Sequence, residues 1–119
     1  MRLPTVLALA PLISLATADS MVIESGCGPT GCATSATWRS PNSANRHFDP
    51  LPGCHPRDRI PGMKTLCLDM DDGRGHFYFD NDPDLKRCIT EGERRTIGPC
   101  KSAQDCGSET TWEEVQCTW

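Results

Sequence analysis

Eight cysteines, three histidines and a short alternation of aspartates are the residues of this 119-residue sequence whose chemistry could be specific. The run Asp80-Asn-Asp82-Pro-Asp84 has the spacing that opens a calcium-binding loop, and Glu91 falls at the twelfth position of that loop. The sixth position, where such a loop needs glycine, is Leu85. We therefore expect a solvated acidic turn or helix start here, and no metal or other cofactor.

Cysteine and histidine can also bind zinc together, and Cys54-His55 places the two types side by side. Structural zinc sites usually take closely spaced pairs such as C-x2-C, and no two cysteines of this chain lie that close. We instead expect four disulfides, although the spacing does not select among the 105 possible pairings of eight cysteines. The cysteines expected to pair are Cys27, Cys32, Cys54, Cys67, Cys88, Cys100, Cys106 and Cys117.

Histidine and carboxylate side chains could also serve a small secreted nuclease as general acid and base. The ending Val-Gln-Cys-Thr resembles the end of fungal guanyl-specific ribonucleases, but those enzymes carry a catalytic histidine shortly before the last cysteine, and no histidine follows His76. The chain is acidic, which does not suit a nucleic-acid partner. It has no G-x-S-x-G motif, and full disulfide pairing leaves no thiol nucleophile. We expect neither enzymatic activity nor nucleic-acid binding.

The first 18 residues have the features of a secretory signal peptide. Arg2 precedes the apolar run Val6–Leu15, and Ala16-Thr17-Ala18 supplies the small residues that a signal peptidase recognises. The run is too short to span a membrane, which takes about 20 apolar residues. We predict cleavage after Ala18 and a secreted, extracellular product made of one disulfide-stapled mature domain, residues 19–119, which we expect to be a monomer without a membrane span.

The predicted mature domain has few residues with which to build a core. Its 101 residues contain 13 Leu, Ile, Val and Phe, although 37% of the whole chain is hydrophobic. The share of Leu, Ile, Val and Phe among these 101 residues, about 13%, lies below the roughly 20% under which chains tend to stay disordered. Its net charge, with 11 basic and 16 acidic residues, is −5. We expect the disulfides to supply the stability that so thin a core does not.

The clearest secondary-structure signal is a β-hairpin. Residues 64–70 and 76–79 are short apolar runs separated by a polar turn with two glycines. Leu66, Leu68 and Met70 share one face of the first strand, as Phe77 and Phe79 share one face of the second. These side chains are predicted to form much of the core.

A helix is predicted over 81–93, because Pro83 and its acidic neighbours suit a helix start and Leu85, Cys88 and Ile89 have helical spacing. Residues 110–119 favour a final strand with Trp112 on the opposite face from Thr111 and Val115, while Cys27 to Cys32 reads as a stapled tight turn. The predicted fold class is small, disulfide-rich α+β, with an antiparallel sheet, one short helix and a long proline-rich loop; the alternative is all-β.

The proline-rich loop, residues 39–62, is the first candidate for a partner-binding surface, because long ordered loops in small domains are often functional. Five prolines argue against a central strand in this segment. The candidate binding residues are Arg46, His47, Phe48, His55, Arg57 and Arg59.

Signal peptide, mature length near 100 residues, paired cysteines and the lack of a catalytic signature together resemble the small cysteine-rich secreted effectors of filamentous fungi. This resemblance implies a virulence protein that acts outside the cell, without catalysis, by binding a host or environmental partner, either an extracellular protein or a glycan. Two alternatives remain open. A secreted protease inhibitor could present residues 39–62 as its rigid loop, and a killer-toxin-like antimicrobial protein would also be disulfide-dense, although many such peptides are cationic.

Overall fold

The computed structural model describes residues 18–41, 43–56, 59–97 and 106–119. Eight strands in these ranges form one antiparallel sheet in the order β3-β2-β1-β8-β7-β6-β5-β4. The strands are β1 (Ser20–Gly28), β2 (Gly31–Arg39), β3 (Arg46–Phe48), β4 (Gly53–His55), β5 (Met63–Asp69), β6 (Arg74–Phe79), β7 (Asp82–Ile97) and β8 (Gly107–Val115). No helix occurs in the described ranges, and none there could cross a membrane.

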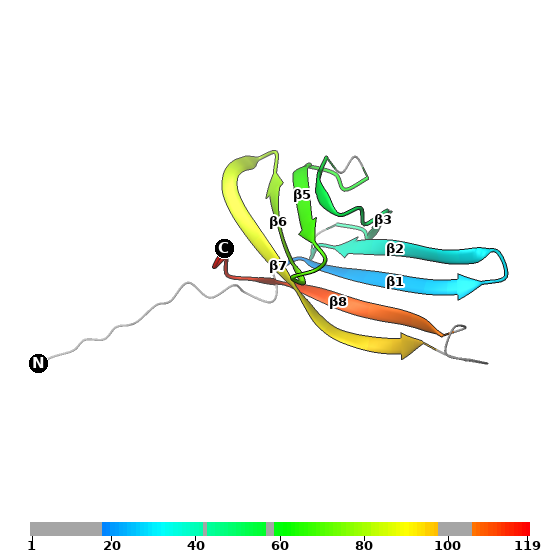
Figure 1. Ribbon diagram of the computed structural model, residues 1–119. Coiled ribbons are helices and arrows are strands. Elements are labelled where there is room, and N and C mark those ends of the chain that lie inside the picture. The colour runs from blue at the N-terminus through cyan, green and yellow to red at the C-terminus, as the bar shows by residue number, and fades with distance from the viewer. Residues whose placement is uncertain (1–17, 42, 57–58, 98–105) are drawn as a thin grey trace, which may run out of the picture.

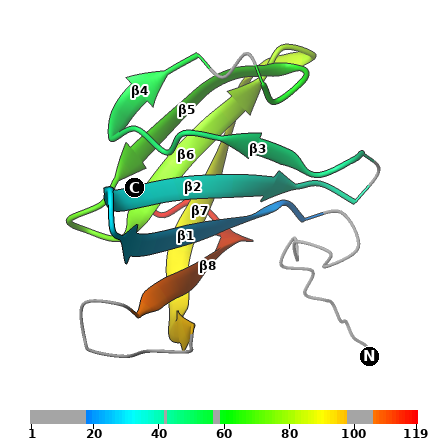
Figure 2. The same ribbon diagram turned by 90° about the vertical axis from the view of Figure 1, so that its right-hand side faces the viewer.

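The sheet is curled into a half-barrel. Its two edge strands, β3 and β4, are neighbours in sequence with only residues 49–52 between them. An extended link of this length spans at most about 17 Å, so the two edges of an eight-stranded sheet cannot lie far apart. In Figure 2 the pair β5–β6 runs at an angle to the pair β1–β2, as expected of a curled sheet.

The core fills the concave face of the half-barrel. Directly paired residues of antiparallel strands project to the same side, so the pairing of Met21 with Trp38 and with Trp112 places all three inside. Trp38 packs edge-to-face on Phe77, with ring centroids 4.9 Å apart. The other buried members of the core are Ile23, Ala36, Phe48, Ile60, Met63, Leu66, Leu68 and Ile89, with Met70 and Phe79 packed against them.

The predicted hairpin is confirmed as β5 and β6. Leu66 pairs with Phe77, and both are fully buried. Gly73 has a φ of 63° in the connecting turn, a conformation that glycine adopts without the steric cost of a Cβ. The hairpin therefore supplies a large part of the core, as its alternation of apolar residues indicated.

The predicted helix over 81–93 is wrong, and with it the α+β fold class, because this segment lies in the 16-residue strand β7. The helical spacing of its apolar residues is coincidental: Ile89 faces the core, Cys88 is buried on the other face, and Leu85 is 51% exposed. Gly92 lies within β7, in a bulge where an added Cβ would approach the carbonyl oxygen of Thr111 to 2.8 Å. Pairing with β6 and β8 on both sides outweighs the local helix signals.

The predicted loop over residues 39–62 is only partly a loop, since it contains β3 and β4. Both strands are three residues long and lie at the edges of the sheet, where proline is tolerated. The predicted last strand is confirmed as β8, with Trp112 in the core, although β8 begins earlier and ends at Val115. The stapled turn is confirmed as the tip of the β1–β2 hairpin.

Disulfide bonding is confirmed at three cross-links, Cys27–Cys32, Cys54–Cys67 and Cys88–Cys117. Cys106 is also disulfide-bonded, while Cys100 lies outside the described residues. Cys88 is fully buried on the convex face, so its bond to Cys117 holds the segment after β8 against the back of β7. Each bridge joins elements that meet in the sheet or lie against it.

Beyond the core, four strands continue as a projecting sheet that we call the distal sheet, made of residues 24–35, 91–97 and 107–109. Figure 1 shows the far ends of β2, β1, β8 and β7 side by side and away from β5 and β6. Residues 91–97 are all exposed, as are 26–35. The Cys27–Cys32 bond staples the tip of this region, which has little apolar packing of its own.

Candidate functional site

Three of the six candidate binding residues lie around one surface groove. Arg46 and His47 come from edge strand β3, and Arg59 precedes β5. With Asn45 and Pro61 they line a groove of about 420 Å³, which we call the basic groove. Both arginines and the histidine are exposed, so the groove presents cationic groups on an acidic protein.

The other candidates are placed elsewhere. Phe48 is 6% exposed and belongs to the core, because its pairing with Ala36 turns it to the concave face. His55 is half-buried, and its Nε2 lies 2.7 Å from the carbonyl oxygen of Pro52 within a hydrogen bond. Neither residue lines the groove. Arg57 lies outside the described residues.

Backbone pairing fixes the side chains of the basic groove. Thr37 pairs with His47, and His47 Nδ1 shares a hydrogen bond of 2.9 Å with Thr37 Oγ1. This bond leaves Nε2 as the nitrogen of His47 that can meet a ligand. The described lining of the groove contains no carboxylate and no Phe, Tyr or Trp. The groove thus offers charge and hydrogen-bond donors, and among its described lining residues none supplies the carboxylate partner that histidine acid–base catalysis commonly uses.

A second cluster of charges lies at the end of the concave face, and sequence reasoning missed it. We call Asp19, Arg87 and Glu114 the charge cluster. The guanidinium of Arg87 donates from Nε and Nη2 to the two carboxylate oxygens of Glu114, over 2.7 and 2.6 Å. Asp19 Oδ1 lies 3.8 Å from Arg87 Nη2. The three residues come from β7, β8 and the residue before β1, which are adjacent only in the folded sheet.

The carboxylate of Asp19 is almost entirely enclosed. Its Oδ2 accepts hydrogen bonds from Trp38 Nε1 and Ser40 Oγ, each over 3.0 Å. Burial raises the pKa of Asp19 above its ordinary value, against the opposing effects of these two donors and of Arg87. The hydrogen bonds that Arg87 donates to Glu114 raise the pKa of Arg87, so its guanidinium stays charged.

The charge cluster borders a cavity of about 520 Å³, which Asp19, Arg87, Phe79 and Asp80 help to line. Arg87 also stacks beside two rings, with its guanidinium carbon 5.1 Å from the centroid of Phe77 and 5.2 Å from that of Phe79. Pro61 lines both this cavity and the basic groove, so the two hollows adjoin. Because the cluster's carboxylates already have hydrogen-bond donors, we assign it to closing the end of the core.

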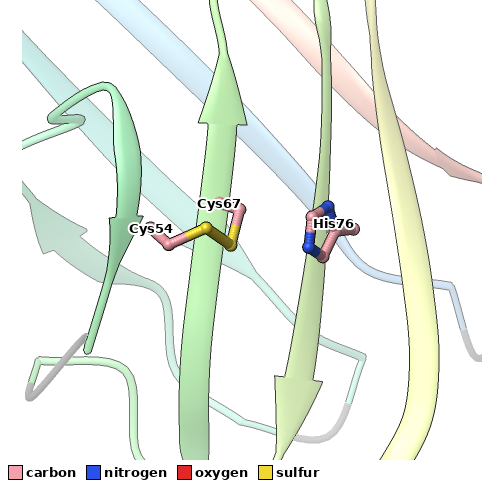
Figure 3. Close-up of side chains that lie close together, drawn as sticks. All are labelled: Cys54, Cys67 and His76. Atoms are coloured by element: carbon pink, nitrogen blue, oxygen red, sulfur yellow. A yellow bond between two sulfur atoms is a disulfide. The ribbon is translucent and has the colours of Figure 1, made fainter.

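One group of side chains has the composition of a metal site. Cys54, Cys67 and His76 lie in a row across β4, β5 and β6, with ligand atoms within 4.8 Å of one another (Figure 3). Both sulfurs are joined in a disulfide, as Figure 3 shows, so neither is a thiolate that could coordinate zinc. Only the imidazole is left as a ligand, and burial together with the charge of Lys86 lowers the pKa of His76.

The end of the chain covers part of the convex face beside His76. Trp119 lines a cavity of about 290 Å³ with Cys54, Cys67 and His76. The guanidinium carbon of Arg74 lies 5.3 Å from the centroid of the Trp119 ring, and Lys86 Nζ donates to the carbonyl oxygen of Trp119. The Cys88–Cys117 bond holds this segment in place.

Comparison of the chain with protein-family models, with curated proteins and with solved structures found no match.

Proposed function

We propose that this chain is an exported, non-catalytic binding protein that recognises an acidic segment of an extracellular protein through the basic groove. The observation that carries the proposal is the grouping of Arg46, His47 and Arg59 around one groove of an acidic chain. The described lining of the groove holds no acidic side chain, and neither Arg46 nor Arg59 takes part in an ion pair among the described residues. Such arginines bind carboxylates through paired hydrogen bonds.

The position of the groove favours an extended protein segment over a glycan. Arg46 and His47 lie on β3, an edge strand of the sheet, and edge strands accept extended segments by strand addition. The described lining has no Phe, Tyr or Trp, the side chains that offer a sugar the broadest apolar face for stacking. A segment with alternating acidic and apolar residues would direct its carboxylates towards Arg46 and Arg59.

Three disulfides are consistent with export, because such bonds persist in oxidising compartments. We further propose that residues 1–18 are removed during export. The resemblance to fungal effectors supports a role of the mature chain at a host interface. The export step is tested by fusing residues 1–18 to a reporter in a secreting host. Reporter in the medium with Asp19 as the first residue of the released chain supports export, and retention inside the cell contradicts it.

The binding step is tested with a fluorescent peptide of alternating Glu and Val and with its Gln and Val counterpart. We expect the chain of residues 19–119 to bind the Glu peptide, and Arg46→Gln to weaken binding about tenfold, as loss of one charge-assisted pair of roughly 1.5 kcal/mol implies. Arg94→Gln is the matched control, because it removes the same charge from the distal sheet. Equal binding of the Glu and Gln peptides would contradict the proposal. Equal loss of affinity in Arg46→Gln and Arg94→Gln would contradict it as well. Preferential binding of polygalacturonate would assign the groove to a glycan.

A further inference from the structure

Asp19, the residue before β1, forms hydrogen bonds through both its backbone and its side chain. Its backbone nitrogen donates to Glu114 Oε1 over 2.8 Å, and the backbone nitrogen of Glu114 donates to the carbonyl oxygen of Asp19 over 3.1 Å. Together with the bonds from Trp38 and Ser40, these contacts leave Asp19 only 4% exposed. Residues near a chain terminus usually fray unless they are tied down, and Asp19 is tied at its backbone and at its side chain.

The charge cluster lacks one positive charge. Asp19 and Glu114 bring two carboxylates, of which the side chains are 5% and 6% exposed, and Arg87 brings one guanidinium. A buried charge without a counter-charge is costly, since the surrounding protein replaces water poorly. A cation at the backbone nitrogen of Asp19 would lie at a distance of 2.8 Å from Glu114 Oε1, which is the distance of a charge-assisted hydrogen bond.

We propose that the peptide bond between Ala18 and Asp19 is a processing site, and that the α-ammonium group released there is the fourth member of the charge cluster, paired with the carboxylate of Glu114. A signal-peptidase-type protease hydrolyses the bond: water adds across the amide, Ala18 keeps the new carboxylate, and the amine of Asp19 takes up a proton. The proposal rests on the export step of the proposed function. Two independent features meet at this bond, the small residues Ala16-Thr17-Ala18 and the contacts of Asp19.

Processing at this bond couples maturation to stability. In the uncleaved chain the nitrogen of Asp19 is a neutral amide, so it donates a hydrogen bond without adding charge. After cleavage the same nitrogen carries a positive charge next to the carboxylate of Glu114. The other charged groups of this region are the carboxylate of Asp19 itself, the guanidinium of Arg87 and Asp80, which lines the adjoining cavity. Because Asp19 is buried in the folded sheet, the protease must act before β1 pairs with β8.

The test compares three chains: residues 19–119 with a free amine, the same chain acetylated at Asp19, and residues 18–119, in which the nitrogen of Asp19 is an amide and the free amine lies one residue earlier, on Ala18. Acetylation keeps the N–H donor and removes the charge, so it is the matched control. We expect the free-amine chain to melt about 4–8 °C above the other two near pH 6. This gap should close as the pH rises above the α-amino pKa, because a raised pKa in the folded state gives stability that is lost on deprotonation.

Glu114→Gln should remove most of the gap between the free-amine and acetylated chains, since it removes the carboxylate partner. If this variant does not fold, NMR titration of the α-amino group in the unchanged chain decides the matter. A pKa above the ordinary range of about 7.7–8.0 supports the pairing. Equal melting temperatures for all three chains, or an unshifted α-amino pKa, would overturn it. All chains are refolded from purified protein, so failure of export in cells leaves this result independent.

Discussion

At the scale of single residues, the two buried tryptophans have different roles. Trp38 and Trp112 are both 1% exposed, but Trp38 Nε1 donates to Asp19 Oδ2. Trp112 Nε1 has no hydrogen-bond partner among the described residues. Trp38 therefore links the apolar core to the charge cluster, whereas Trp112 acts through its ring alone.

Trp38→Phe is expected to destabilise the protein by about 1–3 kcal/mol more than Trp112→Phe, because it leaves a buried carboxylate short of one donor. The two substitutions remove the same atoms from the core, so each is the control for the other. Urea unfolding of both variants measures the difference. Equal losses of unfolding free energy would show that the Trp38–Asp19 hydrogen bond contributes nothing.

His76 gives the folded state a dependence on pH. Burial and the positive charge of Lys86 lower its pKa below the ordinary 6.5, so the unfolded chain binds a proton more readily than the folded one. The stability that this residue contributes is present above pH 6.5 and is lost as the pH falls through the lowered pKa. Since His76 is half-buried, we expect a change of less than about 1 kcal/mol.

The pH effect of His76 is measured by chemical denaturation at pH 7.5 and pH 5. His76→Gln should remove that part of the difference between the two pH values that comes from this imidazole. A variant with the same pH dependence as the unchanged chain would rule out His76 as its source.

At the scale of elements, the paired strands β5 and β6 approach closely at a position that requires glycine. At Gly75 on β6 an added Cβ would lie 2.6 Å from the carbonyl oxygen of Cys67 and 3.0 Å from Leu68 Cδ2. Gly28, at the tip of the β1–β2 hairpin, has no atom within 4 Å of such a Cβ. Gly75 is therefore required by close packing between β5 and β6, whereas the space around Gly28 would accept a side chain.

Gly75→Ala is expected to lose about 1–3 kcal/mol of unfolding free energy, because the neighbouring backbone must shift. Gly28→Ala should be close to neutral. Thermal unfolding of the two variants makes the comparison, and a Gly75→Ala chain that melts with the unchanged protein would mean that β5 and β6 are further apart than described.

The sequence predicted the elements whose signals are local. Alternating apolar residues located β5 and β6, and paired cysteines around Gly28 and Pro29 located the tip of the first hairpin. Strand β7 was misjudged, because its spacing of Leu85, Cys88 and Ile89 fits a helix equally well. Only its neighbours β6 and β8 decide that it is extended, and those contacts are non-local.

Site residues that are close in sequence could be predicted, whereas those that only the fold brings together could not. Arg46, His47 and Arg59 were identified because they lie in one proline-rich segment, and the fold gathers them around one groove. Phe48 could not be separated from them by sequence, because its burial depends on pairing with β2. The charge cluster joins residues 19, 87 and 114, and no pattern along the chain connects positions so far apart.

At the scale of the whole molecule, disulfides staple a sheet that extends beyond its core. The three described bridges close sequence separations of 5, 13 and 29 residues. Restriction of the unfolded chain makes such bridges worth about 2 to 4 kcal/mol each, with the longest loop giving the most. Their sum is comparable with the whole net stability of a small domain, roughly 5–15 kcal/mol.

We conclude that covalent cross-links, added to a small apolar core, hold the sheet on which the basic groove and the charge cluster depend. Near-ultraviolet circular dichroism of residues 19–119 at ambient temperature, before and after complete reduction by excess thiol, tests this conclusion. Because Trp38 and Trp112 are buried, we expect their rings to be fixed and to give a near-ultraviolet signal in the oxidised protein. We predict that reduction abolishes this signal. A fully reduced chain that keeps it would contradict the claim, because the apolar core alone would then suffice.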